Sequence, residues 1–291
     1  MRTCEVALVQ VCAGHDPEPN VERARDWCAQ ALREGSELVV LPEGYAEIPE
    51  PDRSPRWIFD PAAPERGAAI APFAALSHEF PGSLIVLGGV PEAIPGETRH
   101  HNVCVVLQAG RVVARYRKIH LFELADLPDQ PALSESRRVA AGREPMVVAA
   151  PLGRIGLSIC YDLRFPELYR SLVEAGAELL LVPAAFTHAT GQAHWEVLLR
   201  ARAIESQCWL LAAAQWGVHG RGPRRSFGHS MIVDPWGRVV ARLDEGEGLV
   251  RARIEPEPLE RARGVLPALT HRALVRETPA TIVTLSEVPE A

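Results

Sequence analysis

The chain has 291 residues and a net charge of −6, with 31 basic and 37 acidic side chains dispersed along it. This length allows one large α/β domain or two small ones, and an apolar content of 47% is enough for a substantial core. There is no basic stripe of the kind that binds nucleic acid, and no apolar run approaches the roughly 18 residues of a membrane span. The first residues resemble a strand rather than a signal peptide, so we expect a cytoplasmic protein.

Short apolar runs alternate with amphipathic stretches, which predicts strands alternating with helices. Three continuous apolar runs are typical of strands buried on both faces, at residues 37–41, 84–90 and 178–182. Further strands are predicted at residues 4–11, 102–108, 112–117, 146–150, 154–159, 208–214, 228–233, 238–243 and 249–254. Helices are predicted at residues 20–34, 64–80, 166–174 and 192–206, and in a tail from 256 that becomes extended at 281–285.

Turn and cap residues refine this outline. Asn20 is the expected N-cap of the first helix, and Gly35 the residue that ends it. Residues 49–64, 123–145 and 215–226 are predicted loops, of a length found both in lids and in plain surface insertions. Parallel and hairpin-connected strands mixed with helices predict a sandwich of two sheets with the helices outside.

Lysine is almost absent from this chain. Of the 31 basic side chains, Lys118 is a lysine and the others are arginines. Lysine presents a compact ammonium on a flexible stem, whereas arginine presents a planar, permanently charged fork. A lone lysine in this background indicates either a position whose chemistry needs an ammonium or a single remaining surface lysine, and its neighbours must decide between the two.

Three chemically reactive side chains lie at the ends of predicted strands: Glu43, Lys118 and Cys160. Ligands of α/β proteins bind beyond the carboxyl ends of strands, so these three groups are candidates for one site. A thiol with its ordinary pKa of about 8.5 needs a base or a cation to become a nucleophile. Glu43 could take its proton, and Lys118 could stabilise first the thiolate and then an oxyanion. Alternatively, Glu43 is a turn cap and Cys160 a buried core thiol.

The remaining cysteines and two histidines have simpler interpretations. Cys4, Cys12, Cys28, Cys104 and Cys208 lie in apolar strands or helices, where free cysteine acts as a small buried hydrophobe. No C-x-x-C pair or metal-ligand spacing is present in the sequence, so no metal site is expected. His120 and His194 are interpreted as supporting or core histidines.

The segments around the three candidate groups resemble the nitrilase, or carbon–nitrogen hydrolase, superfamily. They read LPEGY around Glu43, YRKIHLF around Lys118 and GLSICYDLRFPELYR around Cys160, in the Glu-Lys-Cys order of that family. The resemblance runs from the first strand to about residue 255. Residues 183–207, together with the segments AAAQWG and GHSMIVDPWG, resemble the branch that contains deaminated-glutathione amidases, with ω-amidases close by.

This resemblance implies a four-layer αββα sandwich with mixed sheets, and one carbon–nitrogen hydrolase domain over residues 1–291. It implies a homodimer or higher homo-oligomer, with the tail at about 256–291 used in subunit contacts, and no cofactor. It also implies a fourth catalytic residue in the loop after the lysine, matched here by Glu135. That loop departs from the family pattern, because Glu123 stands where the family has an aspartate and residues 124–131 are idiosyncratic.

The same resemblance assigns substrate contacts. Arg164, four residues after Cys160, would grip a substrate carboxylate through its fork; the alternative is a structural ion pair with Asp162 or Glu167. The wall and polar contacts of the acyl pocket would come from Phe186, Thr187 and Thr190. The backbone N–H of Tyr161 would complete the oxyanion site.

The expected function is therefore a cysteine-dependent amidase that acts through a thioester on a small carboxylate-bearing amide. The leading substrate is deaminated glutathione, which would give α-ketoglutarate and cysteinylglycine. The alternatives are an ω-amidase acting on α-ketoglutaramate, another small-amide or carbamoyl hydrolase, and a non-catalytic small-molecule binding module. Deaminated glutathione and α-ketoglutaramate share their acyl half, so the space for the leaving group must distinguish the first two enzymes.

Overall fold

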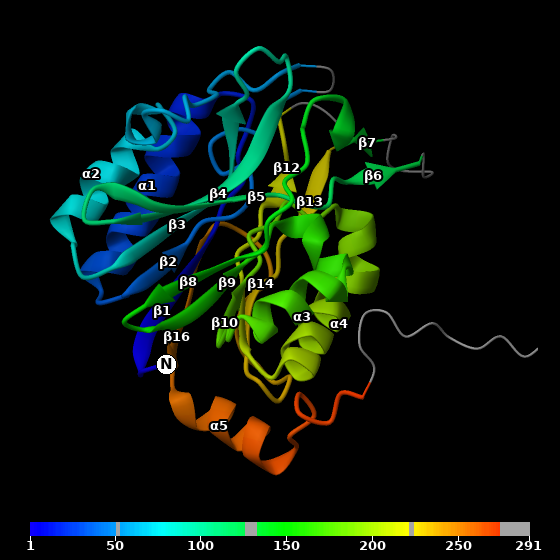
Figure 1. Ribbon diagram of the computed structural model, residues 1–291. Coiled ribbons are helices and arrows are strands. Elements are labelled where there is room, and N and C mark those ends of the chain that lie inside the picture. Colours follow the sequence, from blue (N-terminus) through cyan, green and yellow to red (C-terminus); the bar gives the residue numbers. More distant parts are fainter. Residues whose placement is uncertain (51–52, 126–132, 221–223, 274–291) are drawn as a thin grey trace, which may run out of the picture.

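Two six-stranded mixed sheets pack face to face, with helices on both outer sides (Figure 1). The computed structural model describes residues 1–50, 53–125, 133–220 and 224–273. In spatial order the first sheet contains β16 (Gly248–Ile254), β1 (Cys4–Gln10), β2 (Leu38–Val40), β3 (Leu84–Ala93), β4 (His100–Gln108) and β5 (Arg111–Arg117). The second contains β15 (Val239–Leu243), β14 (Ser230–Val233), β11 (Trp209–Ala212), β10 (Leu179–Leu181), β9 (Gly153–Leu157) and β8 (Met146–Ala150).

Helices α1 (Pro17–Arg33) and α2 (Ala71–Glu79) cover the first sheet, and α3 (Pro166–Glu174) and α4 (His188–Ser206) cover the second (Figure 1). A further helix, α5 (Pro256–Val265), follows β16. Two small hairpins pair β6 (Glu123–Leu124) with β7 (Leu133–Ser134) and β12 (Trp216–Val218) with β13 (Arg225–Phe227). Three short 3₁₀ helices span Pro64–Arg66, Glu135–Arg137 and Cys160–Arg164. This is the four-layer αββα sandwich that the sequence predicts.

Alternation along the strands separates two apolar layers. In β1, Val6 and Leu8 face the second sheet, whereas Ala7 and Val9 face α1 and α2. The inner layer joins both sheets to α3 and α4 in one continuous core. Among the described residues, no helix is long and apolar enough to cross a membrane.

The first two helices differ from their predicted forms. Helix α1 begins at Pro17, so Asn20 is not its N-cap; instead its buried side chain donates to the carbonyls of Gly14 and Ala46. These bonds tie the loop after β1 to the loop after β2, which explains a buried asparagine inside a helix. For the segment 64–80, where a helix is predicted that Pro72 breaks or restarts, the structure has a 3₁₀ turn followed by α2, because Pro72 suits the first turn of a helix rather than its interior.

Part of the predicted loop at 215–226 forms the β12–β13 hairpin. The extended stretch predicted at 281–285 lies outside the described residues.

Because of the directions of the strands, several loops begin at the same end of the sandwich. Strands β1, β2 and β3 are mutually parallel, as are β9, β10 and β11. Strand β5 is two antiparallel pairings away from β3, so it ends at the same edge as β2. The ends of the two sheets meet where the Ala185 N–H, beyond β10, donates to the carboxylate of Glu43, beyond β2, at 3.0 Å.

A β-bulge in β3 makes room at this edge. The register with β4 shifts between Leu87 and Val90, and Gly89 has a φ of +67°. A Cβ at Gly89 would lie 2.7 Å from Cγ of Glu43 and 2.9 Å from Oδ1 of Asn102. The glycine is therefore required by both the positive φ and the close approach of these side chains.

We predict that Gly89→Ala lowers the free energy of unfolding by about 1–3 kcal/mol, because it strains the bulge and displaces Glu43. Urea denaturation measures this loss. Gly82→Ala is the matched control, since nothing lies within 4 Å of its added methyl and its φ is not positive. Equal stability of the two variants would contradict this account of the bulge.

Candidate active site

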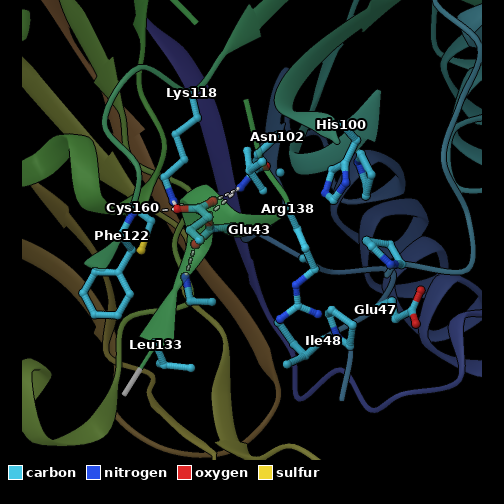
Figure 2. A pocket seen from close by; sticks show the side chains of 18 of the residues that line it. Glu43, Glu47, Ile48, His100, Asn102, Lys118, Phe122, Leu133, Arg138 and Cys160 are labelled. Atoms are coloured by element: carbon cyan, nitrogen blue, oxygen red, sulfur yellow. Dashed lines mark hydrogen bonds and ion pairs between the residues drawn. The ribbon is translucent and has the colours of Figure 1, made fainter. Parts of the chain in front are cut away.

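The ammonium of Lys118 is buried between two carboxylates at this edge (Figure 2). Its Nζ lies 2.9 Å from Oε1 of Glu43 and 2.8 Å from Oε2 of Glu135, and its side chain is 2% exposed. Taking a charge out of water is costly unless it is paired and hydrogen-bonded, and here both conditions are met. Lys118 is thus no surface residue, which resolves the question left open by composition.

Asn102 joins the two carboxylates from the other side. Its Nδ2 donates to Oε1 of Glu43 at 2.9 Å and to Oε1 of Glu135 at 3.1 Å. Its Oδ1 is buried and has no hydrogen-bond partner among the described residues. An unsatisfied buried acceptor is unfavourable, so Asn102 orients the carboxylates at a cost to stability.

Cys160 follows β9 in a left-handed conformation with a φ of +47°, which is unusual for a residue with a Cβ. Its backbone N–H donates to the carbonyl of Pro183 at 2.9 Å, and its thiol lies close enough to the Glu43 carboxylate to be affected by that charge. The residue is 7% exposed and lines the cavity described below. The turn therefore places Cys160 at the edge of the core, where it lines the same cavity as Glu43.

The buried carboxylate of Asp162 holds this turn in place. It accepts hydrogen bonds from the Tyr116 hydroxyl at 2.7 Å, from Nδ1 of His120 at 2.7 Å and from the backbone N–H of Ile159 at 2.9 Å. Tyr116 and His120 flank Lys118 in the chain. One aspartate thus fixes the thiol-bearing turn to the segment that carries the lysine.

The ionisable groups of the site favour one protonation state. Burial favours a neutral Glu43, but the charge and hydrogen bond of Lys118 outweigh it, so the pKa of Glu43 is below its ordinary value. Burial also opposes a charged Lys118, yet the two carboxylates raise its pKa well above the ordinary value. Burial and the adjacent Glu43 charge raise the pKa of Cys160 well above that of a free thiol. The resting site holds carboxylate, ammonium and neutral thiol, a base beside its acid.

These groups line a cavity of about 180 Å³. Of the sequence-predicted residues, Glu43, Lys118, Cys160, Glu135 and Thr187 line it. Thr190 supports this wall, since its hydroxyl lies 2.7 Å from that of Thr187.

Arg164 lies beside the cavity rather than in its lining. The Arg164 guanidinium carbon is 5.0 Å from the ring centre of Phe186 and 5.9 Å from that of Tyr161. Within the described part of the chain it forms no ion pair with Asp162 or Glu167. Arginine and both aromatic residues therefore form one cluster next to the thiol-bearing turn.

Several polar cavity residues were not predicted from the sequence: His100, Asn102, Arg138 and Arg224. Burial lowers the pKa of His100 to about 4, so it is neutral. Arg138 follows Glu135 by three residues, a spacing that eclipses side chains in a 3₁₀ turn and could have indicated it. The described residues contain no group of three or more His, Cys, Asp or Glu side chains arranged to hold a metal ion.

The family profile and the similar proteins of known sequence point to the same family. The sequence profile of the carbon–nitrogen hydrolases matches residues 5–263. A Bos taurus protein named deaminated glutathione amidase is 43% identical over 272 residues, which are 92% of this chain and 81% of that protein.

Two solved structures have the same fold. The Caenorhabditis elegans NitFhit protein superimposes with a TM-score of 0.82 at 37% identity, covering 94% of this chain and 66% of that longer one. Saccharomyces cerevisiae Nit3, described as a member of branch 10 of the nitrilase superfamily, gives 0.80 at 30% identity, covering 91% of this chain and 95% of Nit3.

We predict that Lys118→Met lowers the free energy of unfolding by about 3–5 kcal/mol at neutral pH, because two buried carboxylates lose their cation. Without that cation, burial raises the folded-state pKa of Glu43 above its unfolded value, so the loss grows as pH rises through this pKa. Urea denaturation at about pH 5 and about pH 8 measures both effects. The triple variant Lys118→Met/Glu43→Gln/Glu135→Gln is the control and should lose this pH dependence. A loss for Lys118→Met that is the same at both pH values would contradict the buried ion triplet.

Proposed function

Because the chain belongs to the carbon–nitrogen hydrolase family, we propose that this amidase hydrolyses deaminated glutathione to α-ketoglutarate and cysteinylglycine. The observation that carries the proposal is the thiol of Cys160 beside a carboxylate–ammonium–carboxylate triplet in a cavity. The name of the Bos taurus relative supports the choice of substrate.

In the first step, Glu43 accepts the proton of the Cys160 thiol while the sulfur attacks the amide carbonyl carbon. A C–S bond forms, and the carbonyl π electrons move to its oxygen. The Lys118 ammonium and the backbone N–H of Tyr161 stabilise this oxyanion. Tyr161 lies in the first turn of the 3₁₀ helix Cys160–Arg164, where N–H groups have no intrahelical acceptor.

The tetrahedral intermediate then collapses. Glu43 donates its proton to the amide nitrogen, the C–N bond breaks, and cysteinylglycine leaves with a free amine. An α-ketoglutaryl thioester remains on Cys160. Glu43 next takes a proton from a water that attacks the thioester, the C–S bond breaks, and the thiolate recovers that proton from Glu43. Glu135 keeps Lys118 charged and in place throughout.

Arg164 is proposed to bind the acyl-side carboxylate. Its guanidinium has no carboxylate partner in the described residues, and it lies on Phe186, the residue after Ala185, whose N–H touches Glu43. A planar fork stacked on an aromatic ring suits bidentate carboxylate binding. Thr187, steadied by Thr190, would contribute a hydroxyl to the same wall.

Cavity size favours a peptide leaving group over ammonia. A single water needs roughly 10–15 Å³ on this measure of volume. The cavity of about 180 Å³ has room for a leaving group much larger than ammonia. An ω-amidase acting on α-ketoglutaramate, another small-amide or carbamoyl hydrolase, and a non-catalytic binding module remain the alternatives that the assay must separate.

We predict that the protein releases α-ketoglutarate from deaminated glutathione with a higher kcat/KM than from α-ketoglutaramate, measured with a coupled dehydrogenase. Cys160→Ala should abolish turnover, and Lys118→Arg should lower kcat by about 100-fold or more, because a fork cannot replace an ammonium between two carboxylates.

Cys12→Ala is the matched control and should retain activity, because Cys12 is a free cysteine that does not line the cavity. Substrate should also protect Cys160 from iodoacetamide. Preferred turnover of α-ketoglutaramate would support the ω-amidase instead, and failure to hydrolyse either substrate would contradict the proposal.

A homodimer or higher homo-oligomer in the cytoplasm is proposed as the working form. An exposed apolar patch supports it, formed by Val197 and Ile204 of α4 and Trp236 and Val240 of the β14–β15 hairpin, which are 47–69% exposed. The two surfaces are adjacent, because Nε of Arg200 donates to the carbonyl of Gly237 at 2.8 Å.

We predict that Val197→Arg shifts the protein to monomer in light scattering after size exclusion, because it places a charge in the apolar interface. Val113→Arg is the control: its side chain is also exposed, at 49%, but lies on the edge strand β5. A wild-type protein that is monomeric at micromolar concentration would contradict the proposal.

A further inference from the structure

We infer that Arg138 and Arg224 form the leaving-group subsite and bind the terminal carboxylate of the departing dipeptide. This inference rests on the proposed function, since the cysteinylglycine of deaminated glutathione ends in a carboxylate. It assigns the selection of the leaving group to side chains that take no part in bond breaking.

The placement of Arg138 is the first argument. Its backbone N–H donates to the carbonyl of Glu135 at 3.1 Å, and its own carbonyl accepts from the His100 N–H at 3.0 Å. These two backbone hydrogen bonds fix the position of the Arg138 Cα beside the catalytic triplet. Figure 2 shows the side chain running through the cavity toward Ile48, on the side away from Cys160.

The second argument is the balance of charge in the cavity. The Lys118 ammonium is already paired with Glu43 and Glu135. The remaining lining carboxylate, Glu47, accepts from the backbone N–H of Arg56 at 2.8 Å and forms no ion pair with the cavity arginines in the described ranges. The side chains of Arg138 and Arg224 therefore bring positive charge that no carboxylate of the described chain neutralises.

Arg138 is also free to bind a ligand. One of its terminal nitrogens, Nη1, donates to the carbonyl of Arg53, which leaves its other N–H donors available. The neighbouring His100 is neutral, so it adds no competing charge. Unpaired guanidinium groups in a cavity bind carboxylates strongly through paired, charge-assisted hydrogen bonds.

Arg224 reaches the same cavity from the β12–β13 hairpin. Burial lowers its pKa from the ordinary value, while the charges of Glu43 and Glu135 act in the opposite direction. Its guanidinium is thus within electrostatic range of the reacting groups. Because Arg164 lies outside this lining, the two ends of the proposed substrate are served by different arginines.

The test measures kcat/KM of wild type and Arg138→Gln for three amides. They are deaminated glutathione, its analogue with the terminal carboxylate converted to a carboxamide, and α-ketoglutaramate, which has no distal carboxylate. Arg138→Gln should lower the ratio of kcat/KM for deaminated glutathione to that for α-ketoglutaramate by about 10- to 100-fold, the effect of losing a charged hydrogen bond. On the carboxamide analogue, the kcat/KM of wild type should fall by a similar factor, whereas the kcat/KM of the variant should change little.

Arg137→Gln is the matched control, because Arg137 is the adjacent residue, carries the same charge and is exposed outside the cavity. It should leave the ratio unchanged. Arg224→Gln should lower the ratio as Arg138→Gln does, and thermal unfolding checks that each variant is folded.

If Arg138→Gln reduces both natural amides equally, or the carboxamide is as good a substrate as the acid for wild type, the subsite is wrong while the proposed function stands. If wild type hydrolyses neither deaminated glutathione nor α-ketoglutaramate, both the function and the subsite are overturned.

Discussion

The whole edge of the sandwich depends on one buried ammonium. Removing Lys118 from water costs several kcal/mol, which is recovered only if both carboxylates and the strand that carries the lysine are in register. Glu43 follows β2 and Lys118 follows β5. Glu135 begins the 3₁₀ helix Glu135–Arg137, which lies in the chain between β5 of the first sheet and β8 of the second. The ion triplet thus makes the positions of three distant segments depend on one another. The thiol of Cys160 lies beside these fixed groups.

The use of basic residues follows from the same constraint. At the centre of the triplet a compact point charge must approach two oxygens within 3 Å, which suits an ammonium. Around the cavity, planar forks are suited to carboxylates of a ligand, and there the chain has Arg138, Arg164 and Arg224. At this site the ammonium and the guanidinium groups therefore have different tasks, the first to stabilise charge at an atom and the second to recognise a carboxylate.

Sequence reasoning located Glu43, Lys118 and Cys160 because each follows a predicted strand and because the segments around them resemble the carbon–nitrogen hydrolases. It could not locate Asn102, which lies within β4, because no periodicity distinguishes an asparagine that orients carboxylates from one that begins a strand. The prediction of Asn20 as an N-cap was wrong for a related reason. Asparagine is common at N-caps, but here its buried side chain links two loops from inside α1. Local pattern specifies backbone elements, whereas side-chain bonds between distant segments appear only in three dimensions.

The strained backbone at Cys160 shows how the fold supports reactivity. A non-glycine residue with positive φ costs of order 1–3 kcal/mol and persists only when its surroundings determine it. Here Asp162 supplies that determination, because its acceptors are filled by Tyr116, His120 and Ile159 and cannot be satisfied if the turn relaxes. The strained turn therefore holds the thiol at the cavity that Glu43 also lines.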